Sequence, residues 1–402
     1  MIESVQKQHT QSTHFMKSYI TSPDAVNPAL FLSDPPIEAF AHCKATVALR
    51  LARAGVDFEK YRSLIENRVH TARLQQQREK LKDQKTDSSL FASKDLALGD
   101  PSRVRLVKSS AGRPALDPVL MFRVVFLGQV TQQSDADMSL KIMSDAVTRL
   151  FLKVPPGTCI SRQAIWSYRE IFVKSGLCES ITSAHLEELR EQGLLGNTGA
   201  MILDGSFVEA PKQRNTREEN QLIKQGRGGE LWNDQPAKKR QKDVDARWTK
   251  KNNEVHYGYK IHALADAVSK FLIHNVTTPA NVHDSKALNW VLNEEEDEGR
   301  VLYADSAYAG KELEETVRSF NVTPCFCEKG RVNHPLTAEQ KTNNRKKSKI
   351  RCRVEHVFGF IQTVFTGSFV RSIGFKRAEA HNWLTMLGYN LCRQELFCRK
   401  LE

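Results

Sequence analysis

The spacing of apolar residues changes near residue 199, and this change constrains the fold more than any other feature of the chain. Before it, apolar residues recur every three or four positions, as in helices that bury one face. After it come short apolar runs typical of buried strands. Strands are expected at residues 200–209, 256–265, 271–278, 300–305 and 322–327, and helices at 285–292, 310–320 and 345–364. This order predicts an α/β domain, a mixed sheet flanked by helices, after an all-α region.

A length of 402 residues suggests two or three domains. We expect residues 1–95 to form a polar arm and a helical extension, with a hypothetical role in oligomerisation. Residues 96–197 form a helical region, and residues 198–398 form the α/β domain. Residues 211–253 are charged, polar and Gly-rich, so they are interpreted as an insertion loop in that domain.

The chain is strongly basic, with 59 Lys and Arg against 47 Asp and Glu and a net charge of +12. A balance of this kind favours a polyanionic partner, nucleic acid first. Val119 to Val130, the most apolar stretch, is far shorter than the roughly 20 residues that span a bilayer. The amino terminus lacks the features of a secretory signal, and the eight cysteines are scattered. We therefore expect a cytoplasmic protein with reduced thiols and no membrane partner.

One helix in the first half is a candidate for reading DNA. Ser161 suits an N-cap, and Arg162 and Gln163 follow it in the first turn. A helix-turn-helix motif presents such side chains to base edges. A capped surface helix is the alternative interpretation, and the sequence leaves both open.

Three acidic residues carry the expected chemistry. Asp204 and Asp305 end apolar strands, and Glu355 lies on a basic helix. One Asp at a strand end is usually a turn or cap residue. Three carboxylates at one sheet edge can instead hold two divalent ions, which stabilise both the attacking and the leaving oxygen in phosphoryl transfer.

Five blocks, in this order, resemble the DDE transposases of bacterial insertion sequences, and most closely the fifth insertion-sequence family. The blocks are Leu203–Ser206, His256–His262, Ala280–Ser285, Tyr303–Tyr308 and Arg353–Gly359. Upstream, Gly112–Pro114 and Ile160–Arg162 look like the DNA-binding region of that family, with Arg113 and Arg162 among the candidate DNA contacts. The resemblance covers about residues 95 to 398.

The resemblance implies an RNase H-like catalytic domain with Asp204, Asp305 and Glu355 as its metal-binding triad. The cofactor would be two Mg²⁺ ions, for which Mn²⁺ substitutes. The enzyme would bind the terminal inverted repeats of its element, hydrolyse the phosphodiester there, and join the freed 3′-hydroxyl to target DNA. Its partners would be double-stranded DNA, at the element ends and the target, and further copies of itself in a dimer or larger synaptic assembly. It would be bacterial and nucleoid-associated.

The signature around the glutamate departs from the family at two positions. Ser348 stands where related transposases have Tyr, and Gln362 where they have Lys, whereas Arg351 matches. Arg351 lies one helical turn before Glu355, where it could reach either a phosphate near the metals or a nearby acid.

Basic residues gather around these blocks. Seven cations and no acid occupy residues 341–353, which suits contact with the DNA backbone, although a solvated basic loop is the alternative. The insertion adds Trp232 and Trp248 beside cations, where they could stack on a distorted base or pack on the domain. The candidate DNA-binding residues beyond Arg113, Arg162 and Gln163 are Lys238, Lys239, Arg240, Lys260, Arg345, Lys346, Lys347, Lys349, Arg351 and Arg353.

His283 and Asp284 are interpreted as residues that support the metal site. The histidines near the strands do not predict zinc, because the pair Cys325 and Cys327 lacks the usual spacing. Two other functions stay open on the sequence: a catalytically inactive, transposase-derived DNA-binding regulator, and an RNase H-like structure-specific nuclease.

Overall fold

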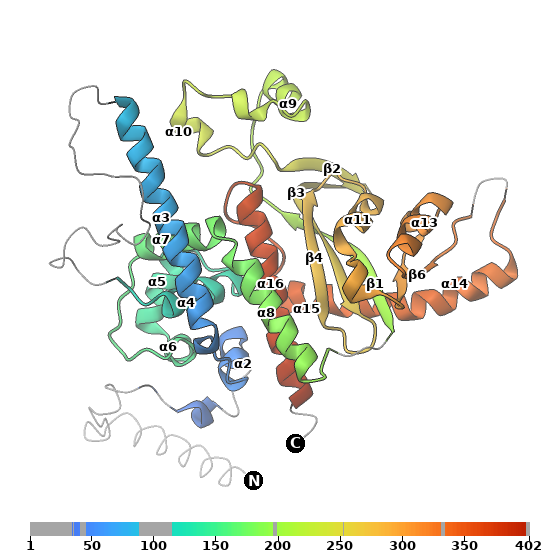
Figure 1. Ribbon diagram of the computed structural model, residues 1–402, viewed down its shortest axis with the longest axis horizontal. Helices are drawn as coiled ribbons and strands as arrows, with labels where there is room; N and C mark the ends of the chain where they lie inside the picture. Colours follow the sequence, from blue (N-terminus) through green and yellow to red (C-terminus); the bar gives the residue numbers. More distant parts are fainter. Residues whose placement is uncertain are drawn as a thin grey trace, which may run out of the picture.

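A mixed six-stranded sheet forms one half of the structure, a computed structural model that describes residues 34, 36–40, 46–87, 115–195, 199–251, 253–330 and 334–398. Its strands are β1 (Ala200–Glu209), β2 (Arg247–Lys251), β3 (Glu254–Asp266), β4 (Leu272–Pro279), β5 (Val301–Ala304) and β6 (Thr323–Phe326). Figure 1 shows the sheet at the right of the molecule. The expectation of a mixed sheet flanked by helices is confirmed.

The strand order is β2-β3-β1-β5-β6, and β4 pairs with the second part of β3. β3 and β4, close to the strands expected at 256–265 and 271–278, pair as an antiparallel hairpin. β1 lies at the centre, antiparallel to β3 and parallel to β5. The two neighbours of β1, which are β3 and β5, come from separate parts of the sequence. Residues far apart in the chain therefore surround a side chain on β1.

Helices make up the described residues before the sheet and flank the strands after it (Figure 1). The first group is α2 (Val47–Arg53), α3 (Arg62–Asp87), α4 (Pro118–Val130), α5 (Asp135–Ser144), α6 (Ala146–Leu152), α7 (Arg162–Lys174) and α8 (Leu177–Glu191). The second is α9 (Arg217–Lys224), α10 (Pro236–Lys239), α11 (Leu288–Val291), α12 (Glu294–Asp297), α13 (Lys311–Ser319), α14 (Ala338–Arg351), α15 (Glu355–Val364) and α16 (Phe375–Cys398). No helix in these ranges has the length and apolar character needed to cross a bilayer.

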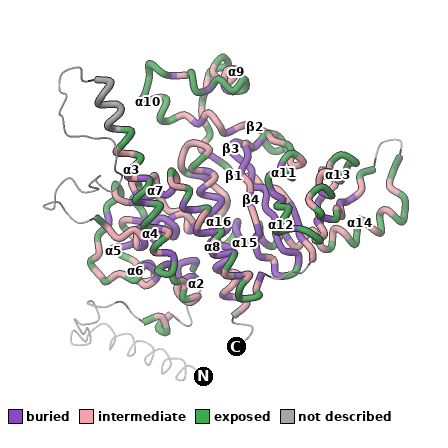
Figure 2. Tube along the Cα trace, in the orientation of Figure 1, coloured by how far each residue is buried: buried purple, intermediate pink, exposed green. Residues whose placement is uncertain are grey.

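The last helix joins the two halves. α16 packs against α2, α4 and α8 on the helical side and against β4 on the sheet side. It is buried along most of its length, as the purple tube between the halves shows (Figure 2). Asn382 donates to the Thr277 hydroxyl and Asn390 bonds to both backbone groups of Leu272, so polar contacts fix α16 on β4. One continuous hydrophobic core therefore runs from α2 to the sheet.

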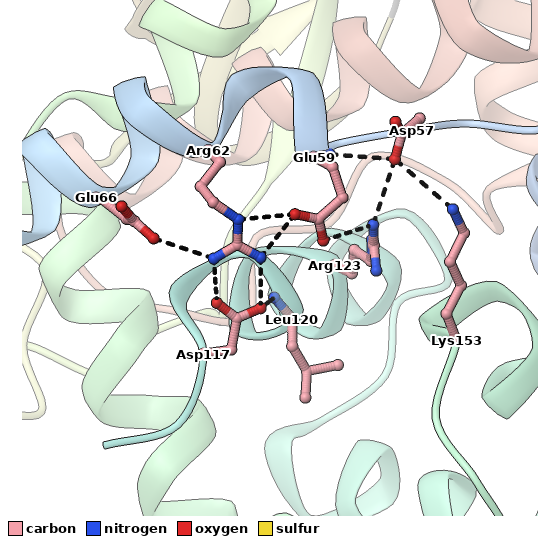
Figure 3. Close-up of polar contacts among 8 residues, drawn as sticks. All are labelled: Asp57, Glu59, Arg62, Glu66, Asp117, Leu120, Arg123 and Lys153. Carbon is pink, nitrogen blue, oxygen red and sulfur yellow. Dashed lines mark hydrogen bonds and ion pairs between the residues drawn. The ribbon is translucent and has the colours of Figure 1, made fainter. Parts of the chain in front are cut away.

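An ion-pair network ties the start of α3 to α4 (Figure 3). Asp117 caps α4, accepting from Leu120 N at 3.1 Å, and it also binds the Arg62 guanidinium at 2.7 Å. Arg123 interrupts the apolar face of α4 and is only 5% exposed. Glu59 lies 3.2 Å from it, and Asp57 3.6 Å. A buried charge needs such partners, so these carboxylates hold α3 where its apolar face meets α4.

Residues 211–253 are folded, contrary to the interpretation as a loop with little core. They form α9, α10 and β2, and the unit projects at the top of Figure 1. Glu219 organises it by accepting from Trp232 Nε1 and from Lys238 Nζ. Buried Asp243 fixes it to the body by accepting from the Tyr259 hydroxyl and from Gly374 N. The core of this unit consists of only a few buried residues that are scattered along the segment. Residues spaced in this way give no periodic pattern of hydrophobicity in the sequence.

The helix expected at 345–364 is broken. α14 ends at Arg351, a 3-10 turn covers Cys352–Val354, and α15 begins at Glu355. Val354 is fully buried, and the turn contacts β1. The sheet thus anchors the chain between the basic helix and the glutamate.

Gly258, in the block His256–His262, has to be a glycine because of its backbone conformation and its close neighbours. Its φ is +142°, and a Cβ there would lie 2.4 Å from the Val208 carbonyl oxygen. Any residue with a Cβ at this position would require the backbone of β1 or β3 to shift. The pairing of β1 with β3 therefore depends on a residue without a side chain at this position.

We expect the free energy of unfolding to fall as the pH drops from about 6.5 towards 4. Burial lowers the pKa of His381, which bonds to Gln129 between α16 and α4, to about 4. The unfolded chain takes up a proton in this window and the folded chain does not, so stability is lost by up to about 1.4 kcal/mol per pH unit for each such group. Urea titrations at several pH values measure the slope.

His381→Gln should give a shallower slope than the wild type. His70→Gln, on the exposed side of α3, is the matched control and should keep the wild-type slope. Equal slopes for His381→Gln and the wild type would contradict this role for His381.

Candidate active site

The sequence analysis places Asp204 at the end of its strand, but in the structure it lies in the middle of β1. The strand continues beyond it to Glu209. Its Oδ1 accepts from Gly205 N at 2.9 Å, and its side chain is 23% exposed. Burial raises the pKa of Asp204, and the nearby Asp305 carboxylate raises it further. The Gly205 hydrogen bond and the charges of Arg351 and Lys251 act in the opposite direction without cancelling the shift. The surroundings of Asp204 therefore disfavour the negative charge of its carboxylate.

Asp305 follows directly after β5, as predicted. β1 and β5 are parallel with Ile202 opposite Tyr303, so Asp204 and Asp305 are the second residues beyond this pair. Asp305 Oδ1 accepts from Ala307 N at 2.8 Å and caps a 3-10 turn, Ser306–Tyr308. The parallel register explains why the Asp305 carboxylate lies near enough to raise the pKa of Asp204.

Glu355 connects to Asp204 through Arg351. Arg351 Nη1 lies 3.3 Å from Asp204 Oδ2, and Nη2 of the same guanidinium lies 3.3 Å from Glu355 Oε1. The Glu355 side chain is 62% exposed, so it reaches this contact from the surface. Of the two uses that the sequence left open for Arg351, pairing with acids is the one present in the free chain.

Tyr308 has a buried hydroxyl beside these carboxylates, which the sequence reasoning missed. The residue is 1% exposed, and its oxygen has no hydrogen-bond partner among the described residues. Burial raises its pKa, and the charges of Asp284, Asp204 and Asp305 raise it further. The sequence signal was its place three residues after Asp305. A buried hydroxyl without a hydrogen-bond partner costs free energy, so it marks this position beside the carboxylates.

Asp284 adds a fourth carboxylate, held by a lysine. Lys260 Nζ is 2.8 Å from Asp284 Oδ1 and donates to the Val282 carbonyl at 2.8 Å. Burial alone would raise the pKa of Asp284, but the Lys260 hydrogen bond and charge lower it below the usual range, helped by His262 and Lys251. A Cβ at Gly205 would lie 3.2 Å from Asp284 Oδ1, so this carboxylate abuts β1 next to Asp204.

An aromatic platform adjoins this cluster. The Phe207 ring stacks on His256 with centroids 4.1 Å apart, and the amines of Lys260 and Lys251 lie 5.4 and 5.9 Å from its centroid. His283, expected as a supporting residue, lies on the adjoining turn and bonds instead to Ser285 Oγ at 2.8 Å. Of these two residues, Asp284 is the one that lies against β1, at Gly205.

The candidate DNA-binding cations fall into two groups. Several are used internally: Lys238 pairs with Glu219, Lys239 binds Asn233, Lys260 binds Asp284, Lys347 donates to the Phe326 carbonyl, Arg351 binds two acids, and Arg353 donates to the Ala267 carbonyl. Others are exposed with no carboxylate paired to them in the described ranges: Arg162, Arg240, Arg345, Lys346 and Lys349. Gln163 is also exposed, and Arg113 lies outside the described residues.

The exposed cations concentrate on α14, which carries no buried residue and projects from the sheet (Figures 1 and 2). Ser161 caps α7 as expected, with Arg162 and Gln163 exposed in its first turn. Of the two tryptophans, Trp232 is 6% exposed and packs under Lys238, whereas Trp248 is 46% exposed and lies against Tyr257. Packing on the insertion therefore explains Trp232 but leaves one face of Trp248 open.

No group of three or more His, Cys, Asp or Glu side chains in the described ranges is arranged to hold a metal ion. Within these ranges, burial and the Asp305 charge disfavour the Asp204 carboxylate, and the Arg351 guanidinium bridges it to Glu355. Carboxylate oxygens are ligands that hard divalent ions prefer, so the chemistry of these donors fits such an ion.

The sheet half matches a known protein family. Residues 196–391 match the family model described as "Transposase DDE domain". The matched segment includes all six strands, Asp204, Asp305 and Glu355, and ends within α16. The domain assignment therefore agrees with the DDE resemblance, at the level of the transposase domain rather than of one insertion-sequence family.

Two solved structures are similar to the chain at low identity. A piggyBac transposase synaptic complex with hairpin DNA has 9% identity and a TM-score of 0.40, covering 92% of this chain and 79% of that one. A pre-cleavage Mos1 transpososome has 10% identity and a TM-score of 0.19, covering 79% and 84%. Both TM-scores are below 0.5, so these likenesses do not establish a shared fold.

We expect two neighbouring isosteric substitutions to change stability in opposite directions when no divalent metal is present. Asp204→Asn removes a charge whose pKa is raised, so the variant should be more stable at pH 7. Asp284→Asn removes a charge whose pKa is lowered and leaves Lys260 without its carboxylate, so it should be less stable. Urea unfolding in EDTA measures both. A shift of both variants in the same direction would contradict this description of the site.

Proposed function

We propose that the chain is a transposase that binds the terminal inverted repeats of an insertion sequence and catalyses metal-dependent cleavage and strand transfer of DNA. The observation that carries the proposal is the carboxylate pair Asp204 and Asp305 on adjacent parallel strands, linked through Arg351 to Glu355, inside the segment that matches a transposase DDE domain. The sheet half would be of the RNase H-like class.

In this proposal Asp204, Asp305 and Glu355 hold Mg²⁺, or Mn²⁺ in its place. Bound there, two ions would polarise the reacting phosphate and activate water, then the 3′-hydroxyl, for in-line attack. β1 and β5 fix the two aspartates through their backbone pairing, so these ligands are preorganised. Glu355 begins α15 behind a 3-10 turn anchored at Val354, so it completes the set from a separate element.

Other residues of the chain would orient the substrate. The Tyr308 hydroxyl can donate to a phosphate oxygen that enters among the carboxylates. Asp284 holds Lys260 at the edge of the site through a 2.8 Å contact, which keeps a positive charge beside Phe207. Trp248, exposed on the neighbouring β2, offers a face on which a distorted base could stack.

DNA would approach along the exposed cations of α14. Arg345 and Lys349 are one helical turn apart on α14, which projects from the sheet, and both are exposed. Arg162 and Gln163 on α7 are the proposed contacts to the terminal repeat. Work on two element ends requires at least two copies of the chain, so the second proposed partner is the protein itself.

The test is a cleavage and strand-transfer assay on a labelled duplex of the DNA that flanks the coding sequence. With Mg²⁺, the wild type should produce a nicked end and a joined product. Asp204→Asn should bind the duplex but lose both products by at least about a thousandfold, because the ligand charge is gone while the folded site remains. Gel analysis of bound and cleaved DNA measures both steps.

The alternatives predict different results in the same assay. A DNA-binding regulator would bind the flanking duplex but never cut it with Mg²⁺ or Mn²⁺. A structure-specific nuclease would cut branched DNA without preference for the flanking repeats and would form no joined product. Either result would overturn the proposal.

Salt dependence tests the proposed DNA surface separately. Arg345→Gln and Lys349→Gln should each lower the slope of log affinity against log salt by about 0.9, because each removes one phosphate contact. Arg318→Gln is the matched control, since Arg318 pairs with Glu314 on α13, and its slope should equal that of the wild type. Unchanged slopes for both α14 variants would remove α14 from the DNA path.

A further inference from the structure

Arg351 is the one cation in direct contact with two of the proposed metal ligands in the described part of the chain. Its guanidinium lies 3.3 Å from a carboxylate oxygen of Asp204 and 3.3 Å from one of Glu355. The two contacts use different nitrogens, so a single planar group bridges the two acids. The Arg351 side chain is 24% exposed, which partly shields both contacts from water.

A divalent ion that binds these carboxylates must contend with this guanidinium. Like charges a few ångströms apart repel strongly when they are partly shielded from water. Arg351 occupies one oxygen of each of two carboxylates that would hold the metal, Asp204 Oδ2 and Glu355 Oε1. The ion and the guanidinium therefore compete both for ligand atoms and through their charges.

Arg351 is also placed where it can move without disturbing the fold. It is the last residue of α14, and the anchored residue of the following turn is Val354, which is fully buried. A guanidinium fork fits a phosphate as well as it fits carboxylates. The exposed cations Arg345, Lys346 and Lys349 on the same helix would bring DNA phosphates close to it.

We propose that Arg351 couples metal binding to DNA binding. In the free chain its guanidinium occupies the metal-ligand carboxylates, and in the complex it turns to a DNA phosphate and leaves them to the metal. This inference rests on the proposed function, because it needs DNA to enter along α14. It makes Arg351 a positioning residue that keeps the site from taking up metal before DNA arrives.

Thermodynamic linkage gives the proposal a measurable form. If DNA removes Arg351 from the carboxylates, DNA raises the affinity for metal, and metal must raise the affinity for DNA by the same factor. Without the guanidinium, the free chain should bind metal more tightly and should gain less from DNA. A purely structural role for Arg351 would predict weaker metal binding instead.

The experiment measures Mn²⁺ binding to the full chain at pH 8 by the electron paramagnetic resonance of free Mn²⁺. Arg351→Gln should bind Mn²⁺ about tenfold more tightly than the wild type in the absence of DNA. Arg351→Lys keeps the charge but not the bridging fork, so its affinity should fall between the two. Arg318→Gln removes one positive charge on α13 and should match the wild type. Circular dichroism and urea unfolding establish that each variant is folded.

The same titration with the flanking duplex tests the coupling. The duplex should raise the Mn²⁺ affinity of the wild type several-fold and that of Arg351→Gln clearly less. Equal or weaker Mn²⁺ binding by folded Arg351→Gln without DNA would overturn the proposal, as would an equal gain from DNA in both proteins.

Failure of the proposed function is recognised separately, because the titration without DNA does not depend on it. If the wild type neither binds nor cuts the duplex, the proposed function and the DNA-coupled half of this inference both fail. If the wild type cuts and joins DNA while Arg351→Gln binds Mn²⁺ as the wild type does, only the inference fails.

Discussion

The repulsion between two carboxylates on adjacent parallel strands is the interaction on which the rest of this site depends. Asp204 is partly buried beside Asp305, and its raised pKa shows that the fold disfavours the charge that it positions there. Besides the hydrogen bond from Gly205 N, a nearby cation stabilises such a carboxylate. The free chain supplies one from Arg351, and the proposed catalyst replaces it with divalent ions. Asp204 would therefore lower the stability of the chain without metal and contribute to activity once metal is bound.

The surrounding structure keeps this arrangement fixed. β1 is held on both sides, by β3 and by β5, and the approach of β3 requires a glycine at position 258. α16 joins the sheet to the helical half through one hydrophobic core. Lys260 stabilises Asp284 with a hydrogen bond, so two neighbouring aspartates have pKa values shifted in opposite directions. The fold thus disfavours the negative charge of Asp204 and stabilises the negative charge of Asp284.

Local signals in the sequence predicted the cap at Ser161 and the position of Asp305 after its strand, because each depends on a few consecutive residues. The folded insertion was missed, since its core residues Ile223, Trp232 and Ala246 are far apart in the chain. The contact of Arg351 with Asp204 joins residues 147 positions apart, and only the tertiary fold decides it. The assignment of the triad and of the DNA contacts stays a prediction.

A crystal structure of the chain with the flanking duplex and Mn²⁺, with the anomalous signal of manganese located, tests the central claim most directly. The account predicts manganese peaks within coordination distance of carboxylate oxygens of Asp204, Asp305 and Glu355, with the Arg351 guanidinium on a DNA phosphate. Manganese bound elsewhere, or Arg351 still bridging Asp204 and Glu355 with DNA present, would contradict it.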